Sequence, residues 1–74
     1  MREKVLEIVK KIAPGVDFEN ETALIDKELL DSFAIIQIVT TFMDEFDVDI
    51  DADDIEPENL NSVDAMCELI SSKR

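Results

Sequence analysis

The segment 32–46 is the feature that most constrains how this 74-residue chain folds. Its sequence, SFAIIQIVTTFMDEF, is strongly apolar and has helical periodicity. Six of its apolar side chains form a wide stripe: Ile35, Ile36, Ile38, Val39, Phe42 and Phe46. A stripe of this width indicates a central helix that contacts several others. Because β-branched residues lower its helix propensity, tertiary packing has to sustain it.

Three further helices are expected around this segment. Apolar residues at helical spacing, followed by Pro14-Gly15, predict a helix from Arg2 to about Ala13. A last helix, capped by Asn61 or Ser62, is expected to run to about Ser71. A short helix is expected at residues 52–56, ending near Pro57, because proline interrupts helices.

The connecting segments complete a prediction of fold class. Residues 16–30 show no sustained period, and their apolar side chains are expected to pin a long loop across the bundle: Val16, Phe18, Leu24, Ile25, Leu29 and Leu30. Residues 47–51 alternate like a strand but have no partner strand, so they predict an extended connector with Val48 and Ile50 inside. The expected fold is an all-α four-helix bundle of three longer helices and one short third helix, in a single domain covering residues 1–74.

Charge and composition exclude several classes of function. Nineteen acidic and seven basic residues give a net charge of −12. That balance argues against nucleic acid and anionic membranes, and it favours partners with basic docking patches. With no histidine to activate a nucleophile, an enzyme is not expected. Cys67 lies on an apolar helix stripe and is expected to be a small, buried apolar side chain. The protein is expected to be cytoplasmic and monomeric.

The start of the central helix carries the main functional signal. Leu29-Leu30-Asp31-Ser32-Phe33 places one hydroxyl at a helix N-terminus, where unpaired backbone N–H groups and the helix dipole favour an anion. Together with the helix order, the acidity and the exit segment 45–50, this motif resembles the acyl and peptidyl carrier proteins. That resemblance covers nearly the whole chain.

The resemblance implies a cofactor, a site and partners. In this family the serine after an aspartate accepts a 4′-phosphopantetheine arm from coenzyme A, which implies attachment at Ser32. It also implies that Asp31 both caps the helix and serves the phosphopantetheinyl transferase. The implied docking residues for the transferase, the loading ligase and downstream acyl-transfer enzymes are Phe33, Gln37, Thr40, Asp44 and Ile55.

The resemblance leaves the cargo open. Carriers of fatty-acid synthesis tend to have acidic residues along the second helix, where this chain has Ala34, Gln37 and Met43. The Leu-Leu-Asp-Ser entry and Gln37 look more like the D-alanyl carriers of teichoic-acid modification. An acyl or aminoacyl thioester in fatty-acid, lipid or related biosynthesis is therefore expected, with the D-alanyl carrier as an alternative.

An alternative hypothesis, from another class of function, is that the chain is an acidic calcium-binding or interaction module without a prosthetic group. The acid cluster from Asp47 to Glu58 follows the ligand spacing of an EF-hand loop. However, Ala52 stands where the loop needs its turn glycine, and Pro57 precedes the bidentate position. No metal site is therefore expected, beyond weak binding of divalent cations by the acid cluster.

The charge imbalance generates a prediction about stability. Added salt or divalent cations screen the self-repulsion of the acidic surface, so the melting temperature is expected to rise with ionic strength. Calorimetry across a salt series measures this. A melting temperature that stays constant would contradict a strained acidic surface.

Overall fold

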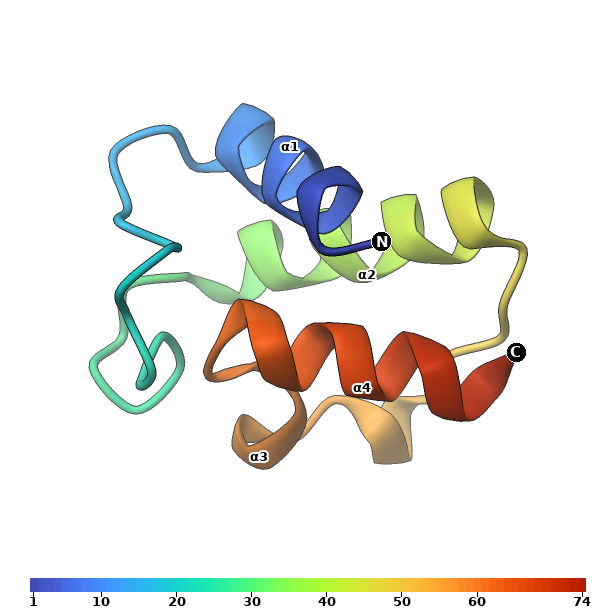
Figure 1. Cartoon of the computed structure of the whole chain (residues 1–74). Coiled ribbons are helices and arrows are strands. Elements are labelled where there is room, and N and C mark those ends of the chain that lie inside the picture. The colour runs from blue at the N-terminus through green and yellow to red at the C-terminus, as the bar shows by residue number, and fades with distance from the viewer.

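The computed structural model describes residues 1–74, and its regular elements are all helices, as the sequence predicts (Figure 1). The elements are α1 (Arg2–Ile12), α2 (Ser32–Phe46), the 3-10 turn η1 (Ala52–Asp54), α3 (Pro57–Leu60) and α4 (Val63–Lys73). Helix α1 packs against both α2 and α4, and α3 packs against α4. None of these helices combines the length and the apolar character that crossing a membrane requires.

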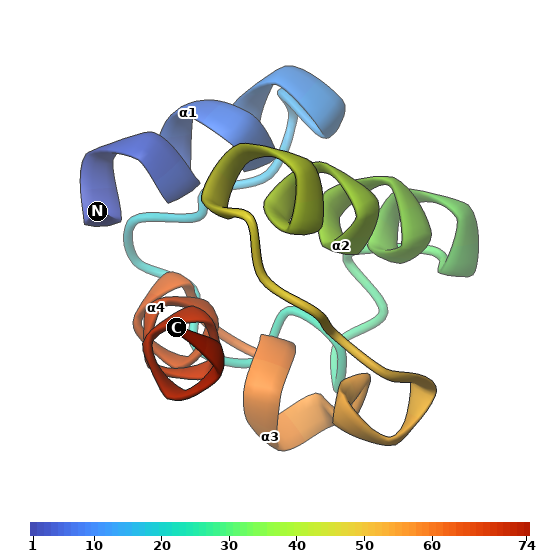
Figure 2. The same ribbon diagram turned by 90° about the vertical axis from the view of Figure 1, so that its right-hand side faces the viewer.

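One apolar core holds these elements together. It consists of sixteen buried side chains, all of them hydrophobic, drawn from every helix and both long connections. Helix α2 contributes Ile38, Val39 and Phe42, and the loop before it contributes Phe18, Leu24 and Leu30. Val48 and Ile50 are also buried, so the connector between α2 and η1 is anchored as predicted; Figure 2 shows it passing between α2 and α4. The fold therefore rests on burial of one face of α2.

Two apolar residues assigned to the core from the sequence lie outside it. Ile36 is 59% exposed and Leu29 is 41% exposed. A helix turns by about 100° per residue, so Ile36 lies about 160° around the axis from the buried Ile38. The apolar stripe of α2 is wider than the surface that the rest of the core covers, and Ile36 falls on the uncovered side.

The prediction for the short third helix was wrong in its bounds. Residues 52–54 form only a single 3-10 turn. Helix α3 begins at Pro57, the residue near which the predicted helix was expected to end. Proline is favourable at the first position of a helix because its missing N–H would have no intrahelical partner. Helix α4 extends to Lys73, past the predicted end at Ser71, and its cap is Ser62, whose Oγ accepts a 3.0 Å hydrogen bond from the Ala65 amide.

The long loop before α2 is tied to the junction between α3 and α4 by one residue, Asn61. Its Oδ1 accepts hydrogen bonds from the amides of Ile25 (2.9 Å) and Asp26 (3.1 Å), and its Nδ2 donates to the Asp26 carboxylate. Its backbone carbonyl accepts from the Leu24 amide at 2.9 Å. Asn61 thus holds the loop at the end of the bundle where α2 begins (Figure 1).

This arrangement predicts the effect of replacing Asn61. The substitution Asn61→Ala removes the acceptor of two loop amides and is expected to lower the free energy of unfolding by about 1–3 kcal/mol. Urea denaturation measures the change. Asn20→Ala is the matched control, since Asn20 is exposed and makes one surface bond to Asp17; its effect should stay within about 0.5 kcal/mol. Equal effects of the two substitutions would contradict the role of Asn61.

Candidate functional site at the start of helix α2

Ser32 is the first residue of α2, and its side chain is exposed to solvent. No hydrogen bond within the chain engages its hydroxyl. Two residues earlier, the side chain of Leu30 is 5% exposed and belongs to the core. The chain therefore passes from a buried anchor to an exposed hydroxyl within two residues, which holds that hydroxyl at a defined point of the surface.

Asp31 caps the helix, as predicted. Its backbone is extended (φ −83°, ψ 172°), and its Oδ1 accepts a 2.8 Å hydrogen bond from the Ala34 amide. Its carbonyl accepts from the Ile35 amide at 3.0 Å. The amides of Ser32 and Phe33 are left without a partner in the chain, and the first turn contains no acidic side chain. Amides without a partner and the positive end of the helix dipole favour an anion at such a position.

The other predicted site residues are all exposed. Phe33, Gln37, Thr40 and Asp44 lie on one face of α2, and the Phe33 side chain is 70% exposed. Ile55 is 37% exposed and follows η1, so it comes from a separate segment. Sequence reasoning missed Ile36, which extends the exposed face of α2. Its apolar character pointed to the core, although its spacing of three residues from Phe33 and four from Thr40 placed it on the predicted exposed face.

Three hollows adjoin this helix, and two of them are lined by residues of its first turns. A shallow groove of about 350 Å³ lies beside the exposed face and is lined by Ile12, Ile36, Gln37, Thr40 and Thr41. On the inner side is a narrow apolar gap, too small for a water molecule, lined by Leu30, Ile35, Ile38, Leu60 and Met66. The start of α2 therefore has an open, mixed surface on one side and a dry apolar seam on the other.

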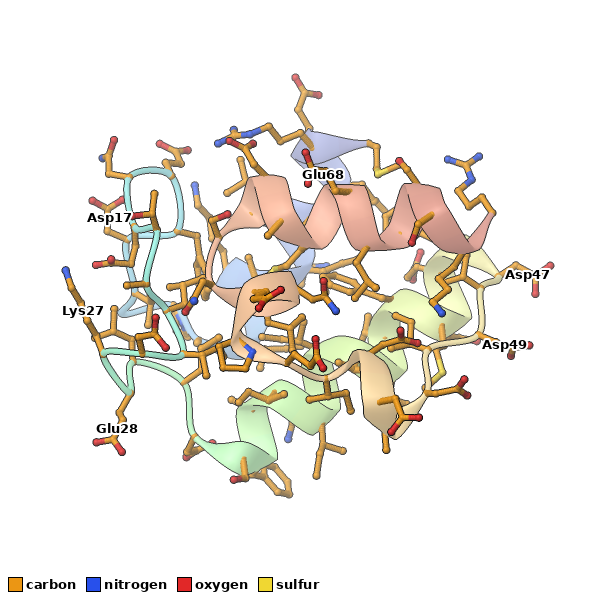
Figure 3. The ribbon with its side chains drawn as sticks, turned by 90° about the horizontal axis from the view of Figure 1, so that it is seen from below. Asp17, Lys27, Glu28, Asp47, Asp49 and Glu68 are labelled. Atoms are coloured by element: carbon orange, nitrogen blue, oxygen red, sulfur yellow. The ribbon has the colours of Figure 1, made fainter.

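The acid cluster from Asp47 to Glu58 does not form a coordinating loop. Asp47 ends α2 in the left-handed conformation (φ 53°), and Asp47 and Asp49 both point outward in Figure 3. Asp54 accepts a 2.8 Å bond from the Lys73 ammonium and a 3.0 Å bond from the Asp51 amide. The Lys73 bond, with help from the amide, lowers the pKa of Asp54. No three acidic, histidine or cysteine side chains are placed to share a metal ion.

Cys67 lies on α4 and is half-buried, less enclosed than its apolar spacing predicts. Burial is the main cause that raises the pKa of its thiol, and the neighbouring Asp64 charge acts in the same direction. A raised pKa keeps the thiol protonated and weakly nucleophilic.

Comparison with known proteins identifies the family of the chain. Residues 3–70 match a protein family described as "Phosphopantetheine attachment site". The chain is also similar to an acyl carrier protein of Desulforapulum autotrophicum, with 38% identity over 56 residues, covering 72% of this chain and 73% of the relative. No solved structure matches the chain significantly.

The capping geometry predicts how two substitutions of Asp31 differ. Asp31→Ala removes the acceptor of the Ala34 amide and is expected to lower the free energy of unfolding by about 1 kcal/mol. Asp31→Asn keeps a capping oxygen, so its stability should stay close to that of the wild type. Chemical denaturation of the three proteins measures this. Equal losses in both variants would show that the carboxylate charge, and not the cap, is what stabilises α2.

Proposed function

Because this chain belongs to the acyl carrier protein family of phosphopantetheine-binding domains, we propose that its 4′-phosphopantetheine arm is attached to Ser32. The observation that carries the proposal is the exposed, unbonded Ser32 hydroxyl at the first position of α2. Asp31 stands directly before it, in the order that the family motif requires. The carrier unit is proposed to be the single domain of residues 1–74.

The residues around Ser32 fit such a group. The amides of Ser32 and Phe33 and the positive end of the α2 dipole stabilise a phosphodiester attached to the hydroxyl. Asp31 fixes the helix start through the Ala34 amide, and Leu30 anchors the preceding chain in the core. When attached, the arm supplies a thiol that holds an acyl group as a thioester. The protein supplies a fixed position, exposure and recognition, and it catalyses no reaction itself.

Asp31 has a second proposed role beside capping. Its carboxylate is exposed and lies one residue from the hydroxyl to be modified. A negative charge there opposes the incoming phosphate, so capping alone does not favour aspartate over asparagine. We infer that the carboxylate serves the transferase through that enzyme's divalent metal. Asp31→Asn is therefore the variant that separates the two roles, because it keeps the cap and removes the charge.

The partners are proposed to be the phosphopantetheinyl transferase, a loading ligase and downstream acyl-transfer enzymes. They are proposed to dock on the exposed face of α2, at Phe33, Gln37, Thr40 and Asp44, with Ile55 contributing. The acidic surface steers partners with basic patches toward the chain. The proposed location is the cytoplasm, where these enzymes and coenzyme A meet.

The proposed cargo is an acyl group of fatty-acid, lipid or related biosynthesis. The similarity to an acyl carrier protein of Desulforapulum autotrophicum supports this cargo. The Leu29-Leu30-Asp31-Ser32 entry and Gln37 support the alternative of a D-alanyl carrier. Loading assays with fatty acids, malonyl groups and D-alanine, each with its ligase or transferase, distinguish these cargoes.

Intact mass spectrometry tests the attachment site. Incubation with coenzyme A, magnesium and a broad-specificity phosphopantetheinyl transferase is expected to add one arm to the wild type and none to Ser32→Ala. Ser62→Ala is a matched control, since Ser62 is also a serine at a helix start, and it should still gain one arm. An arm on Ser32→Ala, or none on the wild type, would remove the proposal.

A further inference from the structure

Glu28, in the loop before α2, has a backbone conformation that its side chain disfavours. Its φ is 57°, in the left-handed region. There the Cβ atom comes too close to the following carbonyl oxygen, and glycine is the residue that avoids this clash. Gly15 is the only glycine of the chain, and its φ is not positive. The chain therefore has a glutamate at a position where glycine would be less strained.

The left-handed residue closes a turn that leads toward Ser32. The Glu28 amide donates to the Ile25 carbonyl at 3.0 Å, and the Leu29 amide donates to the Leu24 carbonyl at 3.0 Å. This pair of hydrogen bonds is the Schellman arrangement, whose left-handed residue is usually glycine. Both bonds join backbone atoms only. The turn thus requires a positive φ at position 28, but it makes no use of the glutamate side chain.

The Glu28 carboxylate has no partner within the chain, unlike the charged residues beside it. The Asp26 carboxylate accepts a 3.2 Å hydrogen bond from Asn61, and the Lys27 ammonium lies 3.3 Å from the Glu21 carboxylate. Glu28 takes part in none of the six ion pairs. Its side chain is exposed and points away from the loop in Figure 3. Folding therefore gains nothing from this carboxylate.

Glu28 lies close to the hydroxyl that is proposed to be modified. It precedes Ser32 by four residues, and four residues of extended chain span at most about 14 Å. A specific interface of standard size buries about 800 Å² on each partner, and a round patch of that area reaches about 16 Å from its centre. Figure 3 shows Glu28 at the end of the molecule where α2 begins. An enzyme that acts on Ser32 therefore comes within reach of Glu28.

We propose that Glu28 binds a lysine or arginine side chain of the phosphopantetheinyl transferase that modifies this chain. The contact depends on the proposed function and identifies one residue that the transferase recognises. From Ser32 to Met43 the helix has no ionisable side chain, and the Asp31 carboxylate is engaged as the helix cap. Glu28 is thus an unpaired carboxylate beside the site. Strained backbone is found at functional sites, where binding offsets what folding loses.

Two substitutions of Glu28 separate its charge from its backbone. Glu28→Gln removes the charge and keeps the strain, whereas Glu28→Gly removes both. Each is expected to lower kcat/KM for modification about fivefold at low salt and less than about twofold at high salt, because an exposed ion pair is screened. The melting temperature of Glu28→Gly should exceed that of Glu28→Gln by about 2–6 °C. The rate of arm transfer from coenzyme A by the broad-specificity transferase and calorimetry measure these effects.

Asp47 provides a matched control at the other end of α2. It is also left-handed (φ 53°) and exposed, its carboxylate takes part in no ion pair, and it lies far from Glu28 in Figure 3. Asp47→Gly therefore removes the same charge from the same backbone conformation. Its kcat/KM should match that of the wild type within about twofold, as expected of a remote charge.

The outcomes separate this contact from the proposed function. If the wild type gains no arm on Ser32, the proposed function fails and the contact fails with it. If the wild type is modified but both Glu28 variants are equally fast, the contact alone is refuted. A loss confined to Glu28→Gly, a loss of equal size in Asp47→Gly, or a loss that persists at high salt would refute it as well. These results would point to the backbone, to the net charge or to a contact that is not ionic.

Discussion

One-sided burial of α2 is the constraint on which the rest of this structure depends. Ile38, Val39 and Phe42 are almost completely buried, while Phe33 and Ile36 on the same helix stand in solvent. A chain of this length is near the lower limit at which a single core suffices, and it has too few residues to cover a central helix on all sides. The covered side of α2 maintains the fold, and the uncovered side is available to partners.

The position of Ser32 follows from three independent restraints that meet at the start of α2. Leu30 is buried in the core, Asp31 caps the helix, and Asn61 ties the preceding loop to the junction of α3 and α4. None of these restraints involves the Ser32 side chain itself. The hydroxyl is therefore both well placed and free, which is what a site modified by another enzyme requires. The loop is long because it has to cross the end of the bundle to reach this point.

The charges of the chain contribute little to its folding stability and act mainly through the long-range electrostatic field. Its six ion pairs join side chains that keep contact with solvent, and pairs of this kind contribute little to folding. The Lys73–Asp54 pair is the most enclosed, and it fastens the end of α4 to η1. A net charge of −12 instead sets the long-range field. The part of α2 from Ser32 to Met43 carries no ionisable side chain, so it adds nothing to that field.

The sequence by itself determined the all-helical class, the bounds of α1 and α2, the buried connector and the exposed serine at the start of α2. These follow from local physics: helical periodicity, a strong cap at Asp31, and alternation at Val48 and Ile50. Only the tertiary structure decided that Ile36 and Leu29 face solvent, that α3 begins at Pro57, and that Asn61 holds the loop. Periodicity shows that a helix has an apolar stripe, but which part of a wide stripe is covered depends on where the neighbouring helices lie. A hydrogen bond between residues 36 positions apart likewise depends on the folded chain bringing them together.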